Sequence, residues 1–299
     1  MLNDSHCHFF STQLFTTLSR QRGRGEAVEQ LCRELQWEDP GTPDALGTRW
    51  VRELDAHGVA RAALIASVPG DEDSVAAAVS LHPNRFVGFF MLDPSAEDAV
   101  VRARRAVKDL GLRGICLFPA MHHVPLHDAR VQHVVEAAAA QQGTAVFVHC
   151  GVLSVGVRRK LGLASRFDIQ LGDPLALSRL ALAFPHVPFI VPHFGAGLLR
   201  ETLMAAEICP NIHIDTSSSN GWIRYTPGLT IEAVFKAAVS VVGPSRLLFG
   251  TDSSFFPRGW QRGIYEAQKA AVSTLGLPAA DEGLIFGGNF DRLFPHRAA

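Results

Sequence analysis

The stretch DSHCHFF, residues 4–10, places two histidines one residue apart in a short β-prone run. Side chains alternate across a strand, so Asp4, His6 and His8 are expected on one face and Ser5 and Cys7 on the other. Residues i and i+2 lie about 6–7 Å apart along a strand, which lets two imidazoles meet on one ion. A His-x-His pair alone is weak evidence, because 13 histidines in 299 residues give close pairs by chance.

Seven further runs of the same kind follow, separated by Ala-, Leu- and Arg-rich stretches with helical periodicity. The predicted strands cover residues 2–8, 60–67, 85–92, 112–118, 144–150, 187–194, 211–217 and 246–252. The predicted helices cover residues 44–57, 71–81, 95–110, 128–142, 174–184, 196–208, 230–242 and 260–275. Eight alternating units predict a single (β/α)8 TIM barrel over residues 1–299, rather than an open doubly wound sheet.

The ends of the predicted helices carry ordinary start and stop signals. Ser95, Asp128 and Asp173 stand where N-caps are expected. Left-handed residues are expected just past three helix ends, at Gly111, Gly143 and Gly276. Residues 281–294 predict one extra helix packed on the outside of the barrel.

Three predicted connections are longer than usual: residues 9–43, 151–173 and 217–229. Each follows a strand and precedes a helix, so all three belong to the C-terminal face, where TIM-barrel active sites are built. Loops of this length also shield a barrel end without any function. Their repeated placement on one face favours a functional site there.

Composition excludes several classes of protein and partner. With 47% hydrophobic and 19% charged residues, the chain is expected to fold around a large core. A net charge of −1 argues against nucleic acid and anionic membranes as partners and leaves a small molecule. No apolar run reaches the roughly 18 residues of a membrane span and no signal peptide is recognisable, so a cytoplasmic protein is expected. The five cysteines show no C-x-x-C spacing, and Cys116 and Cys209 are expected in the core.

Three more polar residues stand at the ends of predicted strands: His149 in VFVHCG, His193 in VPHFG and Asp252 in FGTDSS. Inward-facing residues at strand ends of a closed barrel point toward one spot near its axis, where His6 and His8 are also expected. Singly, each has an ordinary structural role, as a hydrogen-bonded rim histidine or a helix N-cap. Together, imidazole nitrogens and one carboxylate suit a divalent ion such as Zn²⁺.

The segments DSHCHF, VFVHCG, VPHFGAG, LLFGTDSSF and GGNFDRLF, in this order, resemble the amidohydrolase superfamily. The resemblance is to its amidohydrolase 2 branch, which includes aminocarboxymuconate semialdehyde decarboxylase. It implies one metal ion held by His6, His8, His149 and Asp252, with His193 near the metal-bound water as an acid/base or orienting group. It also implies that Asp252 acts as both ligand and base, and it suggests a homodimer.

Two details qualify the resemblance. Binuclear members of the superfamily carry a carbamylated lysine at the end of strand 4, and LRGICLFPA (112–120) has no lysine, so one metal ion is expected. Asp4 is expected on the inward face but deeper than the histidines, where it supports the site without binding the ion.

Such a site serves two reactions. The main prediction is a metal-dependent hydrolase that uses a metal-activated water on a small, carboxylated molecule. The alternative is a non-oxidative decarboxylase of an aromatic or unsaturated acid. Candidate carboxylate-binding residues, each also readable as a solvated surface charge, are Arg158, Arg159, Lys160, Arg224 and Arg258.

Other side chains on the same face are candidates for the pocket wall. The histidines after strand 4 are His122, His123 and His127. The aromatic candidates, which loop packing explains equally well, are Trp222, Tyr225, Phe255, Phe256 and Trp260.

Two other classes of protein remain as alternatives. A TatD-type nuclease has a similar opening motif, but it needs a glutamate ligand after a middle strand, where GFFMLDPS (88–95) and LRGICLFPA offer none. A metal-stabilised scaffold without catalysis needs no acid/base group. His193 beside a full ligand set favours an enzyme over such a scaffold.

Overall fold

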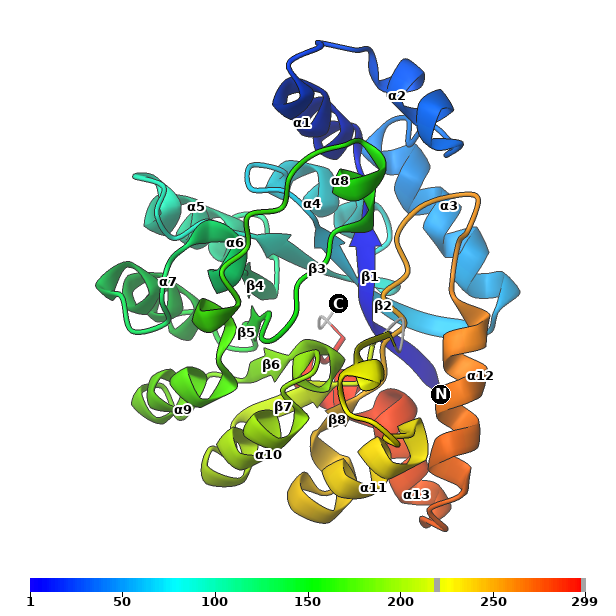
Figure 1. Cartoon of the computed structure of the whole chain (residues 1–299). Helices are drawn as coiled ribbons and strands as arrows, with labels where there is room; N and C mark the ends of the chain where they lie inside the picture. The colour runs from blue at the N-terminus through cyan, green and yellow to red at the C-terminus, as the bar shows by residue number, and fades with distance from the viewer. Residues whose placement is uncertain (218–220, 297–299) are drawn as a thin grey trace.

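Eight parallel strands follow one another in sequence order around a barrel, with helices on its outside, in a computed structural model that describes residues 1–217 and 221–296 (Figure 1). The strands are β1 (Leu2–Phe9), β2 (Val59–Ala66), β3 (Phe86–Met91), β4 (Gly114–Leu117), β5 (Ala145–Val148), β6 (Phe189–Val191), β7 (Ile212–Asp215) and β8 (Leu247–Leu248). This arrangement confirms the predicted TIM barrel. β6 and β8 are shorter than predicted, so His193 and Asp252 lie just beyond them.

Backbone hydrogen bonds between β1 and the segment after β8 close the barrel. The nitrogen of Ser5 donates to the carbonyl of Phe249 at 2.8 Å, and the nitrogen of His8 donates to that of Ser253 at 2.6 Å. Between them, the nitrogen of Asp252 donates to the carbonyl of His6 at 2.9 Å. This pairing fixes Asp252 beside both histidines of the first strand.

The eight outer helices lie close to their predicted positions. They are α3 (Pro43–Ala56), α4 (Glu72–Leu81), α5 (Ala99–Lys108), α7 (Ala129–Ala139), α9 (Pro174–Ala183), α10 (Leu199–Ile208), α11 (Ile231–Val242) and α12 (Arg262–Ser273). Asp128 and Asp173 cap α7 and α9 as predicted, each accepting from a backbone nitrogen of the first turn. Left-handed φ values of 66°, 77° and 64° occur at the predicted Gly111, Gly143 and Gly276.

The predicted cap at Ser95 is wrong. α5 begins only at Ala99, and the hydroxyl of Ser95 donates to Oδ1 of Asp93 at 2.7 Å. The side chain of Asp93 also accepts from the nitrogen of Ser95 at 2.9 Å. These bonds stabilise a turn between β3 and the helix, so the chain is not yet helical there.

The long connections after β1 and β5 contain helices that the sequence did not predict. α1 (Thr12–Arg22) and α2 (Val28–Leu35) follow β1, and α8 (Gly156–Lys160) follows β5. We call these three helices the roof. Apolar residues of the roof form a cluster with the adjoining Trp37, Val68 and Leu161, separate from the barrel core. The roof residues in it are Leu14, Phe15, Leu18, Leu31, Cys32, Leu35 and Val157. The predicted connection 217–229 includes residues 218–220, which lie outside the described residues, and a short 3₁₀ turn at Gly221–Tyr225.

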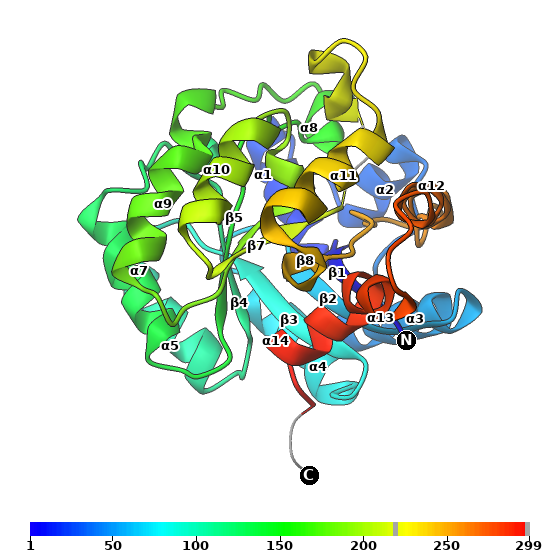
Figure 2. The same cartoon turned by 90° about the horizontal axis from the view of Figure 1, so that it is seen from below.

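The C-terminal segment closes the end of the barrel opposite the strand C-termini (Figure 2). It consists of α13 (Ala279–Gly283), a π-helical turn (Leu284–Gly288) and α14 (Asn289–Leu293). Phe290 and Phe294 pack with the side chains inside the barrel, and the rings of Phe294 and Phe89 lie 5.3 Å apart. The prediction of a helix on the outside is therefore wrong in its placement, because the helix fills the barrel end.

The expected positions of the cysteines are confirmed. Cys116 lies inside the barrel, whereas Cys7 and Cys209 lie between the strands and the outer helices. All five cysteines are buried and unpaired. Within the described part of the chain, no helix has both the length and the apolar character needed to cross a bilayer.

Candidate metal centre

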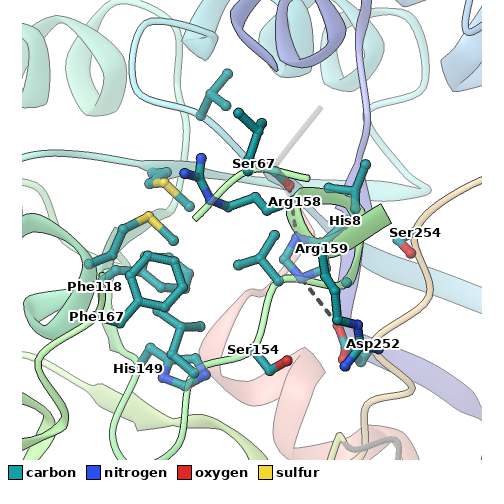
Figure 3. Close-up of a pocket in the computed structure, with 18 of the residues that line it drawn as sticks. His8, Ser67, Phe118, His149, Ser154, Arg158, Arg159, Phe167, Asp252 and Ser254 are labelled. Atoms are coloured by element: carbon teal, nitrogen blue, oxygen red, sulfur yellow. Dashed lines mark hydrogen bonds and ion pairs between the residues drawn. The ribbon is translucent and has the colours of Figure 1, made fainter. Parts of the chain in front are cut away.

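A pocket of about 1310 Å³ opens at the C-terminal ends of the strands, beneath the roof. All five polar residues predicted at strand ends line it: His6, His8, His149, His193 and Asp252. Figure 3 shows His8 between Ser67 and Asp252, with His149 beside Phe118 on another wall. The structure therefore places the predicted metal and acid/base residues in one pocket.

His6, His8 and Asp252 form the tightest group. The Nε2 atoms of the two histidines are 3.3 Å apart, and Oδ1 of Asp252 lies 3.1 Å from Nε2 of His8 and 3.7 Å from Nε2 of His6. One ligand atom from each residue lies within 4.8 Å of the others, the spacing of groups that share an ion. Within the described residues, His149 does not join this group.

His149 lies at the end of β5 and faces His193. The two ring centroids are 5.4 Å apart, and the His149 ring stacks on Phe118 at 5.4 Å. Burial, followed by the neighbouring His193 and His6, holds the pKa of His149 well below its ordinary value. Its buried Nδ1 has no hydrogen-bond partner among the described residues. Phe118 follows β4, where the binuclear relatives implied by the resemblance carry a lysine.

Hydrogen bonds on the far side of the His8 ring direct its Nε2 atom into the pocket. Nδ1 of His8 lies 2.8 Å from Oγ of Ser67, whose own hydrogen is donated to the carbonyl of Ile65 at 2.9 Å. Oγ therefore accepts from Nδ1, and the Nε2 lone pair is free for a ligand. Ser67 was not predicted as a site residue, because a serine after a strand carries no distinctive signal.

Asp215 directs the Nε2 atom of His6 in the same way, and it was not predicted as a site residue either. It is the last residue of β7, is fully buried, and its Oδ2 lies 3.2 Å from Nδ1 of His6. Burial raises the pKa of Asp215, but the nearby His6 and His193 outweigh this and leave it below its ordinary value. The ionised carboxylate can only accept, so the His6 Nδ1 carries hydrogen. A carboxylate ending a strand, as at Asp252, was the available signal.

His193 presents its Nε2 atom in a similar way. Its Nδ1 lies 2.6 Å from the carbonyl oxygen of Ser217, which can only accept. Burial lowers the pKa of His193, so the ring is neutral at neutral pH. The residue lies in the turn Pro192–Gly195 after β6, with a left-handed φ of 59°.

Asp4 supports the site without joining the ligand group, as expected, but its predicted inward-facing position is wrong because of a bulge in β1. The register of β1 against β2 shifts between Asp4 and Cys7, so strict alternation fails there. Asp4 Oδ2 instead accepts from Nε1 of Trp260 at 2.7 Å and from Oγ1 of Thr251 at 2.6 Å. Burial raises its pKa to about 6. Asp4 therefore anchors the segment that carries Asp252, while Ser5 turns toward the site.

The residues present fit a divalent metal ion. The partners of Nδ1 leave both His6 and His8 with Nε2 lone pairs that face each other at 3.3 Å, an arrangement that two neutral imidazoles do not stabilise on their own. Burial would raise the pKa of Asp252, but the neighbouring His8, His6 and His193 outweigh burial and hold it well below its usual range. Two or three imidazole nitrogens and an ionised carboxylate are a zinc-type donor set.

The candidate carboxylate-binding residues all line the pocket, with different partners. Arg158 bonds to the carbonyl of Ala164 at 2.6 Å and to Gln21 of α1. Lys160 lies over the ring of Trp37 at 5.4 Å. The side chain of Arg159, an exposed residue of α8, has no hydrogen bond, ion pair or ring contact within the described residues. Arg159 is therefore free to bind a ligand without first breaking a contact, and the same holds for the exposed Arg166, which also lines the pocket.

The other two arginines are held by their neighbours. Arg224 bonds to the hydroxyl of Tyr225 at 3.2 Å. Arg258 bonds to Oγ of Ser254 and lies 4.5 Å from the ring centre of Phe255. Both guanidinium groups are thus fixed at the pocket rim.

The predicted pocket wall is confirmed in part. His122, His123, Trp222, Tyr225 and Phe255 line the pocket, whereas His127 does not. Phe256 and Trp260 pack between the strands and the outer helices, so their assignment to the wall was wrong. Asp252 is the one carboxylate among the described lining residues.

Comparisons with known proteins identify the family of the chain and agree with its fold. A family model described as Amidohydrolase matches residues 4–295. A variant of 5-carboxyvanillate decarboxylase LigW2 from Novosphingobium aromaticivorans, solved with bound manganese, has a similar structure, with a TM-score of 0.67, 16% identity, and coverage of 98% of this chain and 97% of that one. No curated protein matches the sequence significantly.

Two further solved structures have the same fold. A probable 2-pyrone-4,6-dicarboxylic acid hydrolase from Acinetobacter baumannii, with citric acid bound, gives a TM-score of 0.60 at 14% identity, with 98% of each chain covered. A zinc-bound amidohydrolase from Burkholderia multivorans gives 0.63 at 15% identity, also with 98% of each chain covered. At these identities the similarity establishes the fold.

Proposed function

The chain belongs to the amidohydrolase family, and on that premise we propose that it is a hydrolase with one metal ion, acting on a small carboxylated molecule. The observation that carries the proposal is the convergence of Nε2 of His6, Nε2 of His8 and Oδ1 of Asp252 at the floor of a large pocket. His149, buried with an unpaired Nδ1, is the proposed fourth ligand.

Zinc is the proposed ion, because imidazole nitrogens with one carboxylate are its usual donors. When bound, a divalent ion lowers the pKa of a coordinated water to about 7 and polarises an oxygen of the substrate. Phe118 beside His149 leaves no lysine to hold a second ion at the end of β4. The proposal is therefore one ion per chain.

His193 is the proposed acid/base group. Its Nδ1–H is committed to the carbonyl of Ser217, so Nε2 is the atom that accepts or returns a proton. Because burial lowers its pKa, the ring is neutral before the reaction and can take a proton from the attacking water. In hydrolysis it then passes this proton to the leaving group. Asp252 is the proposed second proton carrier.

The substrate is proposed to carry a carboxylate, because the rim is basic. Arg158, Arg159, Lys160, Arg166, Arg224 and Arg258 line the pocket, against the single carboxylate of Asp252 among the described lining residues. Arg159 is the proposed main contact, since arginine binds carboxylates through two parallel hydrogen bonds. His123 and Trp222 are proposed to contact the rest of the substrate.

Decarboxylation is the second candidate, supported by the fold shared with 5-carboxyvanillate decarboxylase. The same residues would then deliver a proton to the carbon that loses carbon dioxide, with His193 or Asp252 as the donor after it has first taken a proton from water or from an acidic group of the substrate. A TatD-type nuclease fits less well, because the described lining residues include no glutamate. A non-catalytic scaffold leaves the presentation of Nε2 by His193 without a role.

The test is a substrate screen with the zinc-loaded protein. Aromatic and unsaturated carboxylic acids, lactones and amides are offered, and carbon dioxide release is followed against acid or alcohol product. Acid or alcohol product supports the hydrolase, whereas carbon dioxide with the decarboxylated acid supports the alternative. Turnover that persists in a His8→Ala variant would contradict both.

We further propose that the protein works in the cytoplasm as a homodimer on small molecules, without nucleic acid or membrane partners. The net charge of −1 supports the absence of polyanionic partners. Sedimentation equilibrium at several concentrations tests the dimer, and a monomer at all of them would contradict it.

A further inference from the structure

Asp215, at the end of β7, accepts hydrogen bonds with both of its carboxylate oxygens. Oδ2 lies 3.0 Å from Oγ of Ser5 and 3.2 Å from Nδ1 of His6. Oδ1 lies 2.6 Å from the backbone nitrogen of Ser217. One buried carboxylate therefore binds three donors, two from β1 and one from the segment after β7.

Ser217 connects Asp215 to His193. Its backbone nitrogen is held by Asp215, and its carbonyl oxygen accepts from Nδ1 of His193 at 2.6 Å. Its hydroxyl also lies 2.8 Å from Nδ1 of His6 and 3.1 Å from Nδ1 of His193. A hydroxyl donates or accepts and so fixes no tautomer, whereas the carboxylate and the carbonyl only accept.

We propose that Asp215 is a positioning residue that holds His6 and His193 together in the Nδ1-protonated form, so that both Nε2 lone pairs face the pocket. Asp215 does not itself line the pocket, so it acts through the two imidazoles. This inference rests on the proposed function, which assigns His6 to the metal and His193 to proton transfer. It adds that one carboxylate sets the tautomers of both imidazoles.

An Asp215→Asn variant separates this role from simple packing, because it keeps the shape of the side chain. The carboxylate accepts on both sides, whereas an amide has one accepting atom and one donating group. If the NH₂ group faces His6, the Nδ1 atom of His6 must become an acceptor and hydrogen moves to Nε2. If it faces Ser217, two donors oppose each other and the carbonyl bonded to His193 shifts. Either orientation disturbs one imidazole.

Nitrogen-15 NMR of histidine-labelled, metal-free protein measures the tautomers directly. Burial lowers the pKa of His6, but the charge and hydrogen bond of Asp215 outweigh burial and raise it, so spectra are recorded at increasing pH until the histidine signals stop changing. Wild type is then expected to show Nδ1–H for His6 and His193. The two signals are assigned by their loss in His6→Gln and His193→Gln variants. In Asp215→Asn at least one is expected to change to Nε2–H or to a mixture. Nε2–H at either position in wild type overturns the proposal, whether or not the variant folds.

Two variants serve as matched controls. Ser217→Ala removes only the hydroxyl and is expected to keep both tautomers. If a tautomer changes in Ser217→Ala while both stay the same in Asp215→Asn, the proposal is overturned. Thr216→Ala removes a buried hydroxyl that bonds to Gln268 on the other side of the same strand end. Thr216→Ala is expected to lower stability and leave both imidazole signals unchanged. If its imidazole signals change as much as those of Asp215→Asn, the proposal is also overturned.

Cobalt(II) binding, measured by chelator competition, gives the second measurement. Asp215→Asn is expected to bind Co²⁺ about 10- to 100-fold more weakly than wild type, with Thr216→Ala within about twofold. Unchanged affinity in Asp215→Asn overturns the proposal. If wild type itself binds no metal, the proposed function fails, and the tautomer signals still decide whether Asp215 positions the two rings.

Discussion

His193 and Asp252 share an unusual backbone conformation as well as a pocket. Their φ values are 59° and 60°, in the left-handed region that residues other than glycine seldom occupy. Such conformations cost about 1–3 kcal/mol and persist where surrounding structure holds them. Here Asp252 is held by backbone pairing with β1 and by Nε2 of Gln261, which donates to its carbonyl at 2.9 Å. The strain turns both proposed proton-transfer side chains into the pocket.

Replacing His193 by alanine is expected to lower kcat by about 10²- to 10⁴-fold, the usual contribution of an acid/base group. Metal content is expected to stay the same, because the ion is proposed to be held by His6, His8, His149 and Asp252, with His193 as the acid/base group. Steady-state kinetics with elemental analysis checks both, and His127→Ala, which does not line the pocket, is the control. Loss of the metal would show that His193 is a ligand instead.

Asp71 gives a prediction for stability against pH. Its carboxyl group is 2% exposed and accepts from Oγ of Ser11, and burial raises its pKa from 3.8 to about 6. The folded state thus prefers the protonated form. The stability this confers is complete below about pH 4 and is lost as pH rises through about 6. Two pKa units correspond to about 3 kcal/mol at most.

An Asp71→Asn variant cannot ionise, so it should gain stability over wild type by up to about 3 kcal/mol on going from about pH 4 to about pH 8. Denaturant unfolding at the two pH values measures this difference. The exposed Asp109→Asn is expected to show no such gain. The prediction would be contradicted if the free energies of unfolding of Asp71→Asn and wild type differed by the same amount at both pH values.

At the level of residues, the sequence predicted the candidate metal-binding and acid/base residues but not the residues that hydrogen-bond to them. His6, His8, His193 and Asp252 were predicted because parallel strands end at one rim, and they share the pocket. Asp215 and Ser67 were missed, because an aspartate or serine after a strand is common in turns. Asp4 was misplaced because a bulge reverses the alternation, and nothing in residues 2–9 marks the bulge.

The helices of the roof could not be predicted from the sequence pattern that predicted the barrel. α1 and α2 were taken as part of one long loop, since the regular alternation of strand and helix has no place for them. They pack on each other and on α8 rather than on the barrel, as their separate apolar cluster shows. The predicted barrel strands depended on eight repeats of one pattern, whereas these helices occur once. Predicted strand ends were also too long where β6 and β8 stop before their functional residues.

Trp37 is the best point at which to test the roof. Its ring stacks on Phe255 at 3.9 Å, and both line the pocket. Aromatic pairs contribute about 0.5–1.5 kcal/mol beyond burial, so Trp37→Ala is expected to raise KM about 2- to 10-fold. Proteolysis within residues 10–41 should become faster while the barrel melts close to its wild-type temperature.

Trp50 is the matched control for Trp37. It is fully buried between the strands and the outer helices, beside Phe256, so Trp50→Ala is expected to cost about 3–5 kcal/mol of global stability. Global unfolding by both variants to the same extent would show that the roof and the barrel form one cooperative unit, contrary to the prediction.

For the whole molecule, closure of the barrel and assembly of the site are one event. The bonds that close β1 against residues 249–253 also bring Asp252 to His6 and His8. Metal binding should therefore stabilise the folded chain, by about 2.7 kcal/mol when the free ion is at 100 times its dissociation constant. Zinc is expected to raise the melting temperature by several degrees, and a chelator to reverse this. Calorimetry checks it, with His8→Ala expected to show no shift.

The metal content of the purified, zinc-reconstituted chain is the most direct test of the proposed site. Elemental analysis is predicted to give one equivalent of zinc per chain, falling close to zero when His8 is replaced by alanine. Two equivalents per chain would contradict the single-ion site, and none in the wild type would contradict the metal centre as a whole.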